Sequence, residues 1–136
     1  FKKNYYLRNM ILVADSGSSK TDWMAYSPGH TLTFNTQGIN PYFVTANDVS
    51  RILSKNKDLS AYANTITEVY FFGSGCSSPD KHEIISNGLS AFFTKAYTTI
   101  LPIPMWWKPL VIRKRTDPKF KFLFIYANCV NLRRTK

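Results

Sequence analysis

The segment 10–23 (MILVADSGSSKTDW) constrains the fold more than any other part of this 136-residue chain. Residues 10–14 are apolar and include β-branched side chains, which is typical of a buried strand. The strand ends at Asp15, and a turn of small residues with many hydrogen-bond donors follows it. Residues 21–27 again have the pattern of a strand. The sequence therefore predicts a hairpin with a carboxylate at the end of its first strand.

Three kinds of site use a loop of this composition. A P-loop needs G-x-x-x-x-G-K-[ST] at the start of a helix, but here a strand follows Lys20 and no glycine directly precedes it. An aspartic protease of the retropepsin type carries its catalytic Asp in such a loop. It needs two carboxylates that share one site, so a homodimer would have to supply the second. In the third, the phosphate hairpin of the actin, hexokinase and Hsp70 superfamily, the loop reads Asp-x-Gly-x-x-x-Thr, and Asp15, Gly17 and Thr21 match this spacing.

Two later motifs favour the third interpretation. A strand-like run at 30–36 leads into Gly38-Ile39-Asn40-Pro41, and an apolar run at 67–72 leads into Gly73-Ser74-Gly75. The order DSGSSKTDW, TQGINPYF, VYFFGSGC resembles the N-acetylglucosamine kinase family. This family belongs to the BadF/BcrA-type ATPase group of the actin-like superfamily. The resemblance covers about residues 10–96.

The expected fold is α/β: a ribonuclease-H-like, actin-type ATPase lobe that begins β-β-β-α-β-α. We expect strands at about 10–15, 21–27, 30–36 and 67–72. Apolar residues at helical spacing predict a helix at about 46–57, followed by a polar connection at 58–65. Ser78 and Pro79 predict the start of a second helix.

The resemblance implies ATP-dependent phosphorylation of an amino sugar, with N-acetylglucosamine as the first choice, and ATP and Mg²⁺ as cofactors. Asp15 would hold Mg²⁺ through water. The implied phosphate contacts come from Gly17, Ser18, Ser19, Lys20 and Thr21. The implied sugar contacts come from Asn40, Gly38, Gly73, Ser74 and Gly75. The resemblance also implies a homodimer for full-length members of the family.

The composition changes sharply near Ala96. Residues 10–96 carry six basic and seven acidic side chains, whereas residues 97–136 carry nine basic side chains and one acidic one. All six glycines lie at or before Gly88, and four of the seven prolines lie after residue 100. We therefore expect an upstream extension at 1–9, the lobe at 10–96 and an irregular, disordered, basic tail at 97–136.

We hypothesise that the tail is an out-of-frame translation. If Pro104 to Val111 is encoded as CCG ATG TGG TGG AAG CCG CTC GT, the last base of the first codon opens a frame that reads Asp-Val-Val-Glu-Ala-Ala-Arg. This peptide resembles the family's catalytic Asp and the helix after it. The catalytic Asp would then be absent from a truncated chain with little or no kinase activity and limited stability. The alternative is a genuine tail that binds nucleic acid by charge and stacking or a membrane surface.

The formal charge of +10 at first indicates an anionic partner. Because the excess lies in the flanks, we expect no specific nucleic acid and no membrane as partner. The resemblance implies a small sugar as the partner. No apolar run approaches the ~20 residues of a membrane span, and we expect a cytoplasmic protein. Cys76 and Cys129 are too few for a disulfide framework or a zinc site. A second activity in the superfamily, an activator ATPase of a dehydratase or reductase, uses paired cysteines around an iron–sulfur cluster, and Cys76 is the candidate here.

Overall fold

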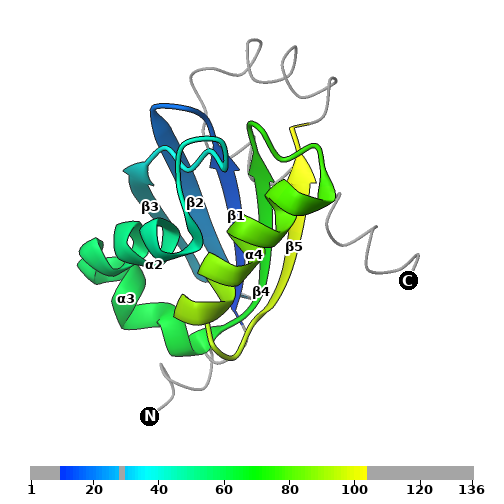
Figure 1. Cartoon of the computed structure of the whole chain (residues 1–136). Coiled ribbons are helices and arrows are strands. Elements are labelled where there is room, and N and C mark those ends of the chain that lie inside the picture. Colours follow the sequence, from blue (N-terminus) through cyan, green and yellow to red (C-terminus); the bar gives the residue numbers. More distant parts are fainter. Residues whose placement is uncertain (1–9, 28–29, 104–136) are drawn as a thin grey trace. The chain divides into compact units, whose positions relative to one another are not determined.

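The computed structural model describes residues 10–27 and 30–103. The strands are β1 (Met10–Ser16), β2 (Lys20–Ser27), β3 (His30–Gln37), β4 (Ile66–Gly73) and β5 (Tyr97–Pro102) (Figure 1). The helices are α2 (Ala46–Lys55), α3 (Lys57–Tyr62) and α4 (Pro79–Phe92), and a short 3₁₀ turn, Ala63–Thr65, follows α3. The expected α/β class is confirmed, and so is the order of the predicted strands and helices.

The strands form one mixed sheet in the order β3-β2-β1-β4-β5. β1 pairs with β2 in antiparallel fashion, and β2 pairs with β3 in the same way. β4 lies parallel to β1, with Asp15 opposite Phe72 and Ser16 opposite Gly73. Because parallel neighbours end at the same edge, the predicted carboxylate turn and the predicted Gly-Ser-Gly segment are brought together.

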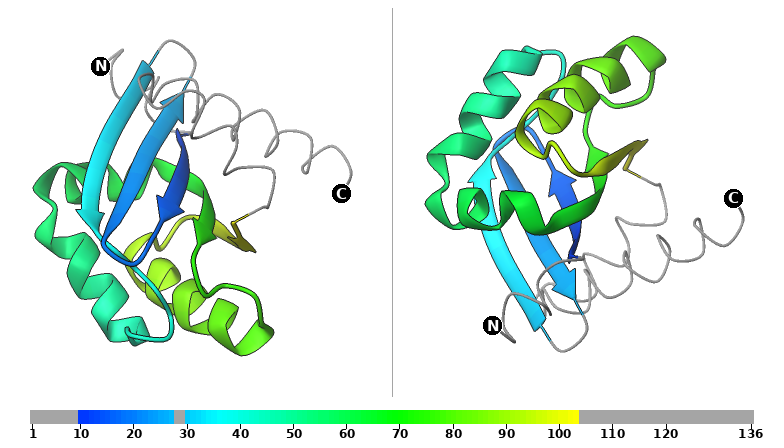
Figure 2. Two further views of the ribbon diagram at one scale, coloured as in Figure 1. Left: turned by 90° about the horizontal axis from the view of Figure 1, so that it is seen from above. Right: turned by 90° about the horizontal axis from the view of Figure 1, so that it is seen from below.

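The three helices cover one face of the sheet (Figures 1 and 2). The core between the layers contains Leu12, Trp23, Leu53, Phe71 and Leu89, all fully buried. The rings of Trp23 and Phe71 lie 5.9 Å apart, and the indole N–H of Trp23 donates to the Thr36 hydroxyl at 2.9 Å. In the described part of the chain, no helix is long and apolar enough to cross a membrane.

Helix α3 replaces most of the polar connection expected at 58–65, so that expectation is wrong. The Asn56 side-chain oxygen accepts a hydrogen bond from Leu59 N at 3.0 Å and caps the new helix. Leu59 is fully buried. Six residues with only one buried side chain are too short to show a helical period, which is why the pattern did not predict this helix.

The expected boundary at Ala96 is also wrong. Residues 97–102 form β5, which pairs in parallel with β4 from Glu68 opposite Tyr97 to Gly73 opposite Pro102. The compact unit that contains the sheet ends at Pro102. The predicted upstream extension at 1–9 and the predicted tail from residue 104 onwards lie outside the described residues.

Gly88 explains how α2 and α4 pack closely. A Cβ atom at residue 88 would lie 2.5 Å from Val49 Cβ and 2.8 Å from the Ala46 carbonyl oxygen. The Ser50 hydroxyl donates to the Gly88 carbonyl at 2.9 Å across the same contact. A glycine within a helix lowers helix propensity, but here it permits the contact between the two helices.

We predict that Gly88→Ala destabilises the protein although alanine favours helices. The gain in propensity is about 1 kcal/mol, whereas overpacking costs about 1–3 kcal/mol. The neighbours are a Cβ atom and a backbone carbonyl, neither of which can rotate away. Urea unfolding should show a lower free energy of unfolding. Asn87→Ala, at an exposed position of α4, is the control and should raise it by about 0.5 kcal/mol. An equal gain at both positions would contradict the packing role of Gly88.

Candidate functional site

Three loops meet at the edge of the sheet where β1, β3 and β4 end (Figure 1, top). They are the turn that follows β1, the loop between β3 and α2, and the loop between β4 and α4. Ser74 N donates to Ser16 O at 2.9 Å, which joins the first loop to the third. Ile39 N donates to Ser16 Oγ at 3.0 Å, which joins the first to the second.

The β1–β2 turn presents hydrogen-bond donors at the surface. Gly17 N donates to Lys20 O at 2.9 Å and closes the turn. Ser18, Ser19 and Lys20 are exposed, and Asp15 is half-buried beside them. The Lys20 ammonium lies 3.7 Å from a carboxylate oxygen of Asp22. Lys20 begins a strand instead of a helix, which excludes a P-loop at this position.

The Thr21 side chain joins β2 to the end of β3. Its side chain is fully buried, and its hydroxyl donates to Gln37 O at 3.0 Å. Ser16 Oγ lies 2.7 Å from Thr21 Oγ1 and also donates to Ile39 O at 2.9 Å. The Thr21 hydroxyl therefore holds the neighbouring loop beneath the turn. The implied phosphate contact of Thr21 stays a prediction. We assign the same structural role to Ser16, which the sequence analysis did not single out.

Gly38 lets the second loop lie directly against the turn. A Cβ atom at this residue would collide with the carbonyl group of Ser18 and would lie 2.5 Å from Gly17 O. Ile39, the next residue, is fully buried. The predicted contact of Gly38 with a sugar stays a prediction. The close packing against the turn is by itself a sufficient reason for glycine at this residue.

The Asn40 side chain organises its own loop. Its oxygen accepts a hydrogen bond from Tyr42 N at 3.0 Å, and its backbone carbonyl accepts from Phe43 N at 2.9 Å and Val44 N at 3.2 Å. The side-chain amide nitrogen is thus the part of Asn40 that can donate to a ligand.

The same loop passes directly into the capped start of α2. Thr45 N donates to an Asp48 carboxylate oxygen at 2.9 Å, and Asp48 N donates to the Thr45 hydroxyl at 3.2 Å. The hydrogen bonds from Thr45 hold the pKa of Asp48 below its usual value. This capping box fixes the end of the loop, because the helix start and the loop share Thr45.

The segment 73–75 lies at the same edge as Asp15, as predicted. Gly73 is buried, and a Cβ atom on it would lie 2.9 Å from Cys76 Sγ. Gly75 has a φ of +78°, in the left-handed region that favours glycine. A Cβ atom on Gly75 would lie 2.6 Å from the side-chain oxygen of Asn40. The third loop therefore lies so close to the second that a side chain at residue 75 would have no space.

His82 and Cys76 connect this loop to α4. His82 is half-buried, and its Nε2 lies 2.7 Å from Cys76 O. Because a carbonyl oxygen only accepts, Nε2 carries the proton. Burial raises the pKa of the Cys76 thiol to about 11. The Cys76 side chain is buried within the lobe and does not lie at a surface where a second subunit could share an iron–sulfur cluster with it, which disfavours the activator alternative.

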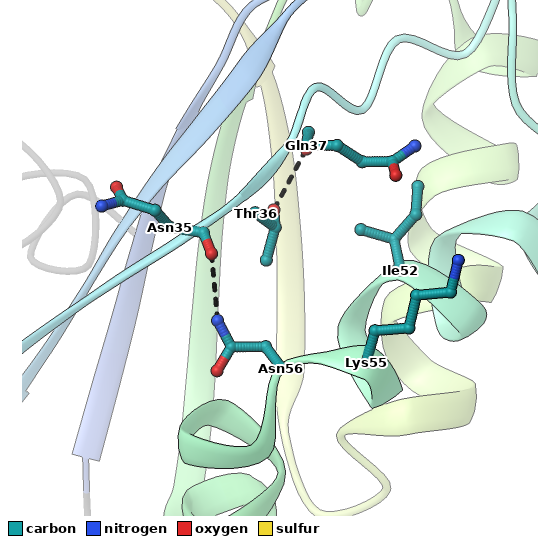
Figure 3. Close-up of a pocket in the computed structure, with 6 residues that line it drawn as sticks. All are labelled: Asn35, Thr36, Gln37, Ile52, Lys55 and Asn56. Carbon is teal, nitrogen blue, oxygen red and sulfur yellow. Dashed lines mark hydrogen bonds between the residues drawn. The ribbon is translucent and has the colours of Figure 1, made fainter.

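The described part of the chain offers few other candidate sites for a metal ion or a ligand. No group of three or more His, Cys, Asp or Glu side chains that could hold a metal ion occurs among these residues. A shallow pocket of about 190 Å³ lies between the ends of β3 and α2, outside the set of predicted ligand residues. Figure 3 shows Ile52 between the side chains of Gln37 and Lys55, while Asn56 donates to Asn35 O at 3.0 Å. Asn56 therefore fastens the end of α2 to the edge strand.

No protein-family model matches this chain, and no curated protein matches it with significant similarity. The kinase interpretation therefore depends on the three motifs and on where the fold places them.

We predict that Gly75→Ala destabilises the protein and displaces Asn40. The left-handed backbone costs an alanine about 1–2 kcal/mol, and the new Cβ would press on the Asn40 amide. Urea unfolding measures the loss. Ser77→Ala, at an exposed residue of the same loop, is the control and should stay within about 0.5 kcal/mol of the unaltered protein. Equal stability of the two variants would show that the two loops are not held together as described.

The raised pKa of Cys76 predicts a loss of stability in alkali. The unfolded thiol ionises near its ordinary pKa of 9.0, whereas the folded thiol ionises only at about 11. The unfolded state therefore releases its proton first, and stability falls as pH rises through this window. Unfolding free energies at about pH 8 and about pH 10.5 should fall less in Cys76→Ala than in its parent. Both proteins carry Cys129→Ser, and an identical fall in both would contradict a buried thiol.

Proposed function

We propose that residues 10–102 form the nucleotide- and sugar-binding lobe of an ATP-dependent sugar kinase, with N-acetylglucosamine as the acceptor. The observation that supports this most is the meeting of three loops at one edge of the sheet. Ser16 is hydrogen-bonded to both of the other loops. In open α/β sheets, ligands bind outside the carboxyl ends of the strands.

The turn after β1 suits a hydrated cation and phosphate groups. Asp15 offers a half-buried carboxylate, the kind of oxygen donor that Mg²⁺ prefers. The exposed residues Ser18, Ser19 and Lys20 offer backbone N–H groups, hydroxyls and an ammonium group to phosphate oxygens. When bound, Mg·ATP supplies the phosphoryl group and neutralises part of its charge. The chain's own residues position it, which is most of what phosphoryl transfer requires.

The second and third loops suit a sugar. The amide oxygen of Asn40 already accepts a hydrogen bond from Tyr42 N. The amide nitrogen can donate to a sugar hydroxyl. Gly75 lets the third loop lie directly against the Asn40 side chain. These loops lie beside the turn, so a sugar hydroxyl held there would face the phosphate groups. The arrangement supports transfer between two ligands bound side by side.

The carboxylate that the resemblance implies after the fifth strand is not found in β5 or at Ile103. In the resembling kinases this Asp is the proton acceptor for the sugar hydroxyl. We therefore propose that this polypeptide binds its ligands but turns them over slowly or not at all. Turnover of N-acetylglucosamine by the purified chain would contradict this part of the proposal.

The two alternative functions, an activator ATPase and an aspartic protease, predict different experimental results. An activator ATPase would yield an iron-containing preparation, but the burial of Cys76 disfavours it. A retropepsin-like protease would show pepstatin-sensitive cleavage at acid pH. The fold instead has a mixed sheet, in which a hairpin is joined to parallel strands, and three helices packed on it. The phosphate-loop interpretation expects this arrangement around Asp15.

We predict that Asp15→Asn weakens binding of Mg·ATP by about tenfold or more, which corresponds to about 1.4 kcal/mol. The substitution keeps the size of the side chain and removes the charge that would hold the hydrated cation. Isothermal titration calorimetry on the full chain measures the affinity. Asp58→Asn, on α3 away from the three loops, is the control and should bind as the unaltered chain does. Equal affinity of Asp15→Asn and Asp58→Asn, or no binding by the unaltered chain, would contradict the proposal.

A further inference from the structure

The loop after β3 presents two neighbouring aromatic side chains to solvent. Tyr42 is 61% exposed and Phe43 is 80% exposed. Tyr97, at the start of β5, is the other large apolar side chain exposed in the described part of the chain. Single exposed apolar residues are common on soluble proteins. The surroundings of the pair, described next, distinguish it from such residues.

Two loops and a helix hold the Tyr42 ring in place. The position of a Cβ atom on Gly75 is 2.9 Å from Tyr42 Cδ2 and 2.6 Å from the Asn40 side-chain oxygen. The ring and the Asn40 amide therefore lie together against the third loop. The Lys81 ammonium, in the first turn of α4, lies 4.3 Å from the centre of the ring, within the range of a cation–π contact.

The backbone of Phe43 is fixed while its ring remains open to solvent. Phe43 N donates to Asn40 O at 2.9 Å, and two residues later Thr45 begins the capping box of α2. This loop has little freedom to fold the ring onto the core. A preorganised aromatic surface of this kind loses little conformational entropy when a ligand covers it.

We propose that Tyr42 and Phe43 form an aromatic subsite that packs against the apolar side of an N-acylated hexose held by Asn40. The inference rests on the proposed sugar site and extends it to substrate selection. A hexose carries hydroxyls around its rim and C–H groups on its faces, and an N-acetyl group adds a methyl. The amide of Asn40 serves the hydroxyls, and the adjacent rings serve the C–H groups and the methyl.

Calorimetric titration of the full chain with N-acetylglucosamine, and separately with Mg·ATP, tests the subsite. Phe43→Ala should weaken sugar binding by about tenfold and leave Mg·ATP binding unchanged. Tyr42→Phe keeps the ring and should bind the sugar nearly as the unaltered chain does. Tyr97→Ala removes an equally exposed aromatic at the opposite end of the sheet and is the matched control. With glucose, which lacks the acyl methyl, the loss in Phe43→Ala should be smaller.

The outcomes separate the subsite from the proposed function. Unchanged sugar affinity in both Phe43→Ala and Tyr42→Ala would overturn the subsite and leave the kinase proposal standing. An equal loss with glucose would overturn the contact with the acyl group. No sugar binding by the unaltered chain would overturn the sugar site itself and the subsite with it. Thermal unfolding midpoints of Phe43→Ala and Tyr97→Ala should agree, because neither ring belongs to the core.

Discussion

The parallel pairing of β1 with β4 is the constraint on which the rest of the lobe depends. It sets Ser16 opposite Gly73, so the carboxylate turn and the Gly-Ser-Gly segment leave the sheet at the same edge. The long connection between the two strands contains the second loop and the α2–α3 helices, and it returns across one face of the sheet (Figure 1). Without this pairing, the third loop would not lie beside the first.

Small residues and buried hydroxyls then bring the loops into contact. Gly38 lies against the carbonyl of Ser18, and Gly75 lies against Asn40 and Tyr42. Ser16 hydrogen-bonds to both the N–H and the carbonyl of Ile39. Each of these contacts has a backbone atom on at least one side. The distance between the loops therefore depends on the main chain and not only on side-chain conformations. The exposed donors of the turn and the exposed rings of the second loop remain available to ligands.

The sequence predicted the elements that have a clear period and missed those that lack one. Apolar runs identified β1 and β4, and the turn residues identified the hairpin. α3 has a single buried residue and gave no clear signal. Tyr97–Leu101 consists largely of strand-forming residues, but the change of composition near Ala96 led the predicted lobe to end before it. The sequence also showed which residues are polar but not which way they point. Thr21 is buried, and His82 bonds to Cys76 O, because tertiary contacts decide both.

The central claim is that one continuous ligand site lies across the three loops. Backbone amide shifts from nuclear magnetic resonance, recorded on the full chain during titration, test it most directly. We expect Mg·ATP to shift the amides of Gly17, Ser18 and Ser19, and N-acetylglucosamine to shift those of Asn40 and Gly75. Shifts confined to the pocket between β3 and α2, or no shifts with either ligand, would contradict the account.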